Sequence, residues 1–228
     1  SDIHGNLDAL RAVLATAERR SFHKLLVAGD IVFPGPEPLE TWRRLSAAGA
    51  IMVQGVSDRA LATLDPSSLT PRSEHERLML DRMKQVRSEL GDLVLERIRR
   101  LPTHQRIPLE DGGELVLVHG TPVHPDEPLS FDMSDEEIDA ELGDECGDVV
   151  VCGMSHTPFQ RDIGGVRVIN VGSIGEAPDG LKEPIAYGSD VYPQVAHATW
   201  IESTPQGIQV EPITVPLDPP ARRLKSGT

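Results

Sequence analysis

Short apolar segments that stop abruptly at a glycine or a histidine recur along this chain and limit the folds it can adopt. The segments cover residues 24–28, 50–54, 114–118 and 148–152. Each has the length of a buried strand and is shorter than a typical core helix. Segments with helical spacing alternate with the first two strands, and this alternation predicts an α/β fold.

Helical spacing and capping signals place the remaining elements. Apolar residues predict helices over 6–20, from about 38 and over 74–100, the last broken near Gly91. Ser134 and Glu137 have the spacing of a capping box, which predicts a short helix there. Three further strands are expected over 166–171, 194–201 and 207–213. We therefore expect a single domain over 1–216 and a disordered tail over 217–228.

The acidic composition limits the partners of the protein. The 228 residues include 22 Lys and Arg against 36 Asp and Glu, a formal net charge of −14. This charge disfavours binding to nucleic-acid phosphates and to anionic membranes. The apolar runs are too short for a membrane span, the first residues lack a signal-peptide pattern, and two cysteines cannot form a disulfide framework. We expect a cytoplasmic protein without nucleic-acid or membrane partners.

Polar side chains gather directly after the predicted strands. The residues that share this placement are Asp30, Asp58, His119 and His156, together with the pair Asp2 and His4 near the first residue. Ligand sites of open α/β sheets form at the carboxyl ends of strands. Any one of these residues alone is best interpreted as a surface or loop residue, but their shared placement indicates a metal site. Carboxylates and imidazoles without thiolates suit Mn, Fe or Zn.

Five motifs occur in order along the chain. They are SDIHGN at 1–6, VAGDIV at 27–32, VHGTP at 118–122, DVVVCGMSHTP at 148–158 and NVGSIG at 170–175. Together they resemble the motifs of the calcineurin-like metallophosphoesterases, and most closely those of the small bacterial and archaeal single-domain phosphodiesterases. The similarity runs from residue 1 to about 187. The first motif alone is moderately specific, whereas the ordered set is a strong signal.

The resemblance implies a fold, a reaction and a set of ligands. The fold is a four-layer α/β/β/α sandwich of two mixed sheets flanked by helices. The reaction is hydrolysis of a small soluble phosphoester, by a phosphodiesterase or phosphatase with two metal ions and water as the nucleophile. Carried over to this chain, the first ion, such as manganese, takes Asp2, His4, Asp30 and His156. The second ion shares Asp30 and takes His119.

Two ligand positions of the second ion carry apolar residues in this chain. Val56 stands where the family has an asparagine, and Met154 stands where it has the first histidine of a Gly-His-X-His motif. Neither side chain is a good ligand for Mn, Fe or Zn. A structural four-ligand zinc site is worth roughly 10–16 kcal/mol, so losing two ligands weakens binding by about three or more orders of magnitude. We expect one tight ion and a second that is weak or absent.

The same substitutions leave the function open between two main interpretations. One is a metal-dependent phosphoesterase with weakened activity that acts on a small phosphorylated molecule. The other is a non-catalytic member of the fold that binds a metal or a phosphorylated ligand and has lost turnover. A third interpretation is a folded relic whose interactions lie elsewhere on its acidic surface.

Three further residues and the start of the chain complete the expectations. Asn6 either caps the first helix or helps to present backbone N–H groups to an anion. Ser57 stands in place of a substrate-side histidine and is expected to be a phosphate-side hydroxyl. His124 is the remaining histidine that could supply a ligand. Family members carry an apolar strand before the first motif, and without that strand we expect residues 1–4 to fray.

Overall fold

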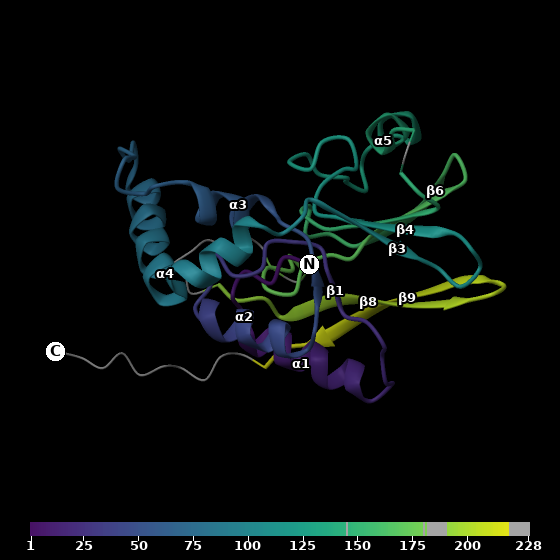
Figure 1. Cartoon of the computed structure of the whole chain (residues 1–228), viewed down its shortest axis with the longest axis horizontal. Coiled ribbons are helices and arrows are strands. Elements are labelled where there is room, and N and C mark those ends of the chain that lie inside the picture. Colours follow the sequence, from purple (N-terminus) through teal and green to yellow (C-terminus); the bar gives the residue numbers. More distant parts are fainter. Residues whose placement is uncertain (145, 180, 182–190, 219–228) are drawn as a thin grey trace.

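The computed structural model describes residues 1–144, 146–179, 181 and 191–218 (Figure 1). The helices are α1 (Leu7–Glu18), α2 (Pro38–Ala47), α3 (Val56–Thr63), α4 (Glu74–Arg99) and α5 (Asp135–Leu142). The strands are β1 (Leu26–Val27), β2 (Ile51–Met52), β3 (His104–Pro108), β4 (Glu114–Val118), β5 (Val149–Cys152), β6 (Phe159–Ile163), β7 (Val166–Asn170), β8 (Val195–Thr204) and β9 (Gly207–Pro216). Every element expected from the sequence is present, and α3, β3 and β6 are additional.

A five-stranded mixed sheet forms the centre of the fold, in the order β3-β4-β5-β7-β6. β4, β5 and β7 run parallel, and β3 and β6 pair antiparallel at the two edges. The inner strands β4 and β5 are buried almost throughout, which explains their continuous apolar sequences. The edge strands β3 and β6 each have one fully buried residue, so their sequences lack a recognisable strand pattern.

The second β layer consists of two separate strand pairs rather than the one mixed sheet that was expected. β1 and β2 pair in parallel over two residues each, and β8 and β9 form an antiparallel hairpin of ten residues per strand. β1 ends early because Gly29 and Asp30 adopt positive φ values of 80° and 51°, which leave the extended conformation. Within the described residues, the two pairs are not joined by strand pairing.

Three hydrophobic clusters lie between four layers. The first fills the space between α1, α2 and α4 and the β8–β9 hairpin. The second lies between the two β layers, and the third lies between the central sheet and α5. Successive residues of β4 point into different clusters, Leu115 and Leu117 into the second and Val116 and Val118 into the third. This arrangement is the α/β/β/α sandwich that the resemblance implies.

The segment before α1 is buried, contrary to the expectation that it frays. Residues 1–4 are all buried, and the N–H groups of Asp2 and His4 donate to the carbonyl oxygens of Gly29 and Asp30, each at 3.0 Å. Asn6 Oδ1 then accepts the N–H of Ala9 at 3.1 Å, so Asn6 caps α1, which is one of the two roles considered for it. The carbonyl groups of the loop after β1 therefore fix this segment in place.

Two further predictions concern the break in α4 and the tail of the chain. α4 is interrupted at Gly91, which has φ 70° and ψ 166°, as its sequence indicates. The N–H of Leu217 donates to the C=O of Gln194 at 2.9 Å, and the rest of the predicted tail, from residue 219, lies outside the described residues. In the part of the chain that the structure describes, no helix combines the length and apolarity of a membrane span.

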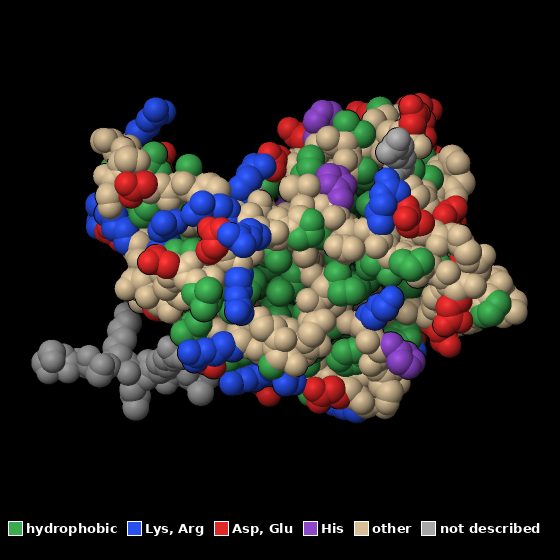
Figure 2. Space-filling view, in the orientation of Figure 1, with side chains coloured by type: hydrophobic (Ala, Val, Ile, Leu, Met, Phe, Trp, Pro, Cys, Tyr) green, Lys and Arg blue, Asp and Glu red, His purple; other side chains and the backbone are tan. Residues whose placement is uncertain are grey.

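Charged side chains of both signs share the face shown in Figure 2. Lys and Arg side chains (blue) gather over the helices on the left of this view, among Asp and Glu side chains (red). On this face, the basic side chains are therefore not spread evenly.

Candidate metal centre

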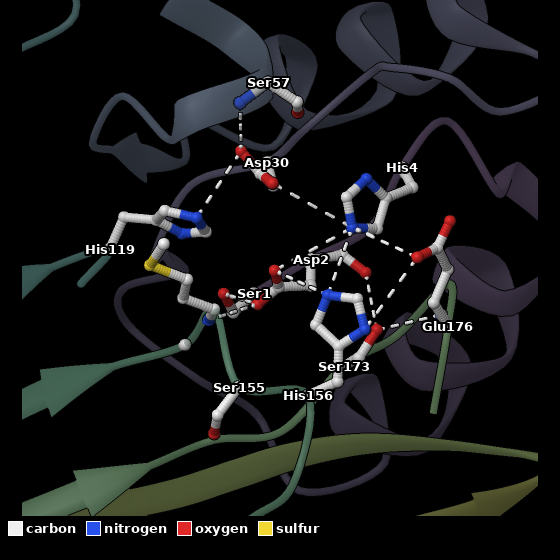
Figure 3. A network of polar contacts seen from close by, with 12 residues as sticks. Ser1, Asp2, His4, Asp30, Ser57, His119, Ser155, His156, Ser173 and Glu176 are labelled. Atoms are coloured by element: carbon white, nitrogen blue, oxygen red, sulfur yellow. Dashed lines mark hydrogen bonds and ion pairs between the residues drawn. The ribbon is translucent and has the colours of Figure 1, made fainter. Parts of the chain in front are cut away.

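Loops that follow three of the strands meet the first residues of the chain at one end of the β layers (Figure 3). Asp30 follows β1, His119 directly follows β4, and His156 lies in the loop after β5. Figure 3 shows these side chains around those of Asp2 and His4. The structure therefore brings together all five ligands that the motifs imply.

The backbone of the site adopts a conformation that side chains disfavour. Positive φ values between 49° and 66° occur at Asp2, His4, Asp30, Met154 and His156. Ser21 is the sixth such non-glycine residue in the described part of the chain. The left-handed conformation costs roughly 1–2 kcal/mol per residue, and such strain concentrates at functional sites.

Asp2, His4 and His156 form the first group of potential ligands. Asp2 Oδ1 is 3.8 Å from His4 Nε2 and 3.2 Å from His156 Nε2, and the two Nε2 atoms are 3.3 Å apart. Donor atoms that bind one ion at about 2.1 Å lie roughly 3.0–3.4 Å from each other in tetrahedral or octahedral geometry. Two of the three distances lie in this range and the third exceeds it by about 0.4 Å, so the three atoms are close to the spacing of a shared divalent ion.

Asp2, Asp30 and His119 form a second group, which shares Asp2 with the first. Asp30 Oδ1 is 3.5 Å from His119 Nε2, and its other oxygen, Oδ2, is 4.0 Å from His4 Nε2. Asp30 thus has one oxygen near each group, but the residue common to both groups is Asp2, whereas the resemblance implies Asp30 as the shared ligand.

Backbone carbonyl groups orient two of the histidines. His4 Nδ1 is 2.6 Å from the carbonyl oxygen of Phe33, and His119 Nδ1 is 2.7 Å from that of Ala28. Because a carbonyl oxygen can only accept, each Nδ1 carries the proton and donates it. In the neutral form of each ring, Nε2 then faces the site with its lone pair, which is the arrangement found in most metal-binding histidines.

Two buried atoms of the site lack a hydrogen-bond partner among the described residues, namely Asp2 Oδ1 and His119 Nε2. His156 Nε2 lies 3.2 Å from Asp2 Oδ1 but without the geometry of a hydrogen bond. Leaving a buried polar atom unpaired costs about 1–3 kcal/mol. Atoms that point at a common position rather than at one another are typical of a metal-binding set, and nitrogen and oxygen donors suit Mn, Fe or Zn. The residues present therefore fit a divalent ion.

The charges of the site shift the pKa values of its groups. Burial would raise the pKa values of Asp2 and Asp30, but the neighbouring histidines outweigh it, and both pKa values are lowered. Burial lowers the pKa of His119, but Asp30 and then Asp2 outweigh it and raise this pKa to about 9. The pKa of His156 is also raised, by Asp2 and Glu176 against the effect of burial. In the metal-free protein, His119 is therefore protonated at neutral pH, because the carboxylates of Asp30 and Asp2 stabilise its positive charge.

The two apolar replacements stand next to backbone groups that hold the carboxylates. The N–H of Ser57, the residue after Val56, donates to Asp30 Oδ1 at 2.9 Å. The N–H of Met154 itself donates to Asp2 Oδ2 at 3.0 Å. The main chain at both positions therefore still supports the site, although neither side chain offers a nitrogen or oxygen donor.

Glu176 belongs to the site although it was not among the sequence candidates. Its Oε2 is 3.7 Å from His4 Nε2 and 3.8 Å from His156 Nδ1. It directly follows the NVGSIG motif at 170–175, and an acidic residue at that point was the signal that could have identified it.

Three other candidates have roles of different kinds. Ser57 Oγ donates to the carbonyl oxygen of Phe33 at 3.4 Å, beside the site. His124 Nδ1 lies 3.0 Å from Glu141 on an exposed ring, and neither group of potential ligands in the described chain includes it. Asp58 accepts the N–H groups of Ile31 and Gly55, each at 3.0 Å, and so supports the loops structurally.

Comparisons with known proteins found similar sequences and similar folds. The model of the calcineurin-like phosphoesterase superfamily domain matches residues 1–188. The uncharacterized protein MJ0912 of Methanocaldococcus jannaschii is 28% identical over 202 residues, which cover 80% of this chain and 77% of that protein. The hypothetical protein PH1004 of Pyrococcus horikoshii has a similar structure, with a TM-score of 0.76, 22% identity and coverage of 95% of this chain and 86% of that one. A metallophosphoesterase of Sphaerobacter thermophilus has a TM-score of 0.67 with the same identity and coverage.

Proposed function

Because the chain belongs to the calcineurin-like phosphoesterase superfamily, we propose that it hydrolyses a small soluble phosphoester as a metal-dependent phosphodiesterase or phosphatase. One divalent ion, Mn, Fe or Zn, binds tightly, and a second binds weakly or not at all. The observation that carries this proposal is the convergence of Asp2, His4 and His156 on one position, with Asp2 Oδ1 buried and unpaired among the described residues.

In this proposal, different residues of the site bind the ion and stabilise the charge of the phosphate. Asp2, His4 and His156 hold the first ion, and Asp30 contacts both ligand groups. When bound, a divalent ion supplies Lewis-acid polarisation of a phosphoester oxygen and activates water. Protonated His119 places a positive charge where phosphate oxygens approach, or, once deprotonated, it gives its Nε2 to a second ion.

Two residues of the site are partly exposed to solvent. Asp2 and His119 are fully buried, whereas the side chains of His156 and Glu176 are 26% and 24% exposed. In this proposal, a phosphoryl group of the substrate reaches the ligands past these two residues. Both cysteines are free, which supports a cytoplasmic location.

The experiment that tests this proposal is hydrolysis of bis-p-nitrophenyl phosphate and p-nitrophenyl phosphate with Mn²⁺. We expect slow release of p-nitrophenolate that EDTA stops and Asp2→Asn removes. Asp8→Asn is the matched control, because Asp8 is an exposed acid on α1 outside the site. Metal-loaded protein that hydrolyses neither ester would contradict the proposal.

A second candidate function is a binding protein without turnover, and one observation favours it. Both positions that would complete the second ion site carry apolar side chains, Val56 and Met154. This candidate predicts that metal-loaded protein binds inorganic phosphate or p-nitrophenyl phosphate and releases it unchanged. Isothermal titration with phosphate, on the samples used for the hydrolysis assay, distinguishes the two functions.

A further inference from the structure

The side chain of Asn170 reaches from the end of β7 to the loop that carries His156. Asn170 is the last residue of β7 and is 1% exposed. Its Nδ2 donates to the carbonyl oxygen of Gly153 at 2.6 Å and to Ser155 Oγ at 3.0 Å. A third acceptor, the carbonyl oxygen of Leu129, lies 3.2 Å from the same nitrogen. One buried amide thus contacts the loop of His156 at two points.

These contacts matter because the main chain does not orient the ring of His156. His4 and His119 each donate from Nδ1 to a carbonyl oxygen. Within the described residues, no hydrogen bond joins the His156 ring to the main chain, and its Nε2 faces Asp2 and His4. His156 also has a φ of 60°, a left-handed conformation that surrounding contacts must maintain. The position of this ring therefore depends on the loop that carries it.

Asn170 holds that loop on the side away from the ligands. Ser155 Oγ, which accepts from Asn170 Nδ2, donates in turn to the carbonyl oxygen of Thr157 at 3.5 Å. The residues on both sides of His156 are thereby connected to Asn170. Figure 3 shows the Ser155 side chain pointing away from the group of ligands, whereas the ring of His156 points towards it.

The oxygen of the same amide holds the turn that supports Asp2. Asn170 Oδ1 accepts the N–H of Gly172 at 3.0 Å. In the same turn, Ser173 Oγ donates to the carbonyl oxygen of Asp2 at 2.9 Å. The amide of Asn170 therefore connects two segments that carry ligands, the loop of His156 and the first residues of the chain.

The two polar atoms of this amide cannot exchange places. Carbonyl oxygens only accept, so the nitrogen must face Gly153 and Leu129, and the oxygen must face the N–H of Gly172. An aspartate has almost the same shape, but it would place an oxygen without a proton against two carbonyl oxygens. Asn170→Asp therefore removes the donor and leaves the volume of the side chain unchanged.

We propose that Asn170 is a positioning residue that sets the place of His156 relative to Asp2 and so determines the affinity for the first ion. This inference rests on the proposed function, which supplies the ion. Both polar atoms of the amide are hydrogen-bonded to residues outside the group of ligands, so Asn170 acts through the loop and the turn.

The first test is Mn²⁺ binding to metal-free protein, by isothermal titration of wild type, Asn170→Asp and Gln160→Glu. Gln160 is exposed on β6, which pairs with β7, so its variant makes the same amide-to-carboxylate change away from these contacts. Residues that orient metal ligands typically contribute about 10–100-fold to metal affinity. We expect Asn170→Asp to weaken Mn²⁺ binding at least tenfold and Gln160→Glu to change it less than twofold.

A second measurement separates positioning from a loss of stability. Val168→Ala removes buried packing from β7 in the cluster between the central sheet and α5, so it lowers the melting temperature without touching the loop of His156. The visible spectrum of Co²⁺-loaded protein reports the number and arrangement of the ligands. We expect this spectrum to change in Asn170→Asp and to stay as in wild type in Val168→Ala. If Asn170→Asp does not melt cooperatively in EDTA, the shorter and uncharged Asn170→Ser replaces it in both measurements, with the same expectations.

The outcomes separate this inference from the proposed function. If wild type binds Mn²⁺ and the folded Asn170 variant loses less than tenfold in affinity, or has an unchanged Co²⁺ spectrum, the role of Asn170 is overturned and the proposed function stands. If wild type binds no Mn²⁺, both are overturned.

Discussion

At the scale of single residues, Asp2 and Asp30 each have one carboxylate oxygen that accepts a main-chain N–H and a second oxygen that faces His4. Asp2 Oδ2 accepts the N–H of Met154 while its Oδ1 faces the histidines, and Asp30 Oδ1 accepts the N–H of Ser57 while its Oδ2 faces His4. Anchoring one oxygen fixes the direction of the other, so the side chain loses little conformational entropy when an ion binds.

The raised pKa of His119 predicts how the metal-free protein responds to pH. Its pKa is about 9 in the folded protein against an ordinary value of 6.5, so protonation favours the folded state. This contribution is complete below pH 6.5 and is lost as pH rises through 9, and it amounts to about 3 kcal/mol at most. Denaturant unfolding in EDTA between pH 6.5 and 9.5 should show the loss in wild type and much less of it in His119→Gln. Equal pH dependence in the two proteins would refute this assignment.

Restoring both missing donors should create a second tight site. Val56→Asn or Met154→His alone returns three of four ligands and should change little. The double variant should bind one more ion and raise diester hydrolysis by more than the product of the single effects. Metal content and rate are measured on the same samples. A double variant that binds no additional ion would show that the main chain no longer places these side chains correctly.

At the scale of elements, the sequence predicts the strands whose two faces are both buried and misses the strands that are partly exposed. The continuous apolar sequence of β4 is identified over its full length, whereas the edge strands β3 and β6 are missed because most of their residues are polar and partly exposed. The helix α3 is missed because its start, Val56 and Ser57, reads as part of a motif and its N-cap is a glycine. The motifs locate the five predicted ligands, but Glu176 was missed because it lies one residue beyond the NVGSIG motif at 170–175.

One element contact supports the site from a distance. Arg82 of α4 is buried, and it donates to the carbonyl oxygens of Pro34, at 2.9 Å, and Gly35. These residues directly follow Phe33, whose carbonyl oxygen orients His4. Arg82 thus connects α4 to a histidine ligand.

Removing the guanidinium should therefore affect both stability and metal binding. Arg82→Met leaves the carbonyl groups of two half-buried residues without that donor, and we expect it to cost about 1–3 kcal/mol of unfolding free energy and to weaken Mn²⁺ binding severalfold. Arg97→Met, at an exposed position on the same helix, is the control and should be nearly neutral. Chemical denaturation and Mn²⁺ titration measure the two effects. Unchanged metal affinity in a destabilised Arg82→Met would limit the role of Arg82 to the fold.

At the scale of the whole molecule, the layered core places ligands from distant parts of the sequence at one end of the β layers. The carboxyl ends of β1, β4 and β5 bring Asp30, His119 and His156 together with the first residues of the chain. The positions of these residues therefore depend on the packing between the layers. We propose that this site binds one ion tightly, whereas the resemblance to the family implies two.

The most direct test of that claim is the number of ions that the wild-type protein retains. Protein loaded with Mn²⁺ or Zn²⁺ and dialysed extensively is analysed for metal and for protein concentration. We expect one ion per chain, lost in Asp2→Asn, because the intact ligands converge on one position. Two retained ions per chain, or none at saturating metal before dialysis, would contradict the account.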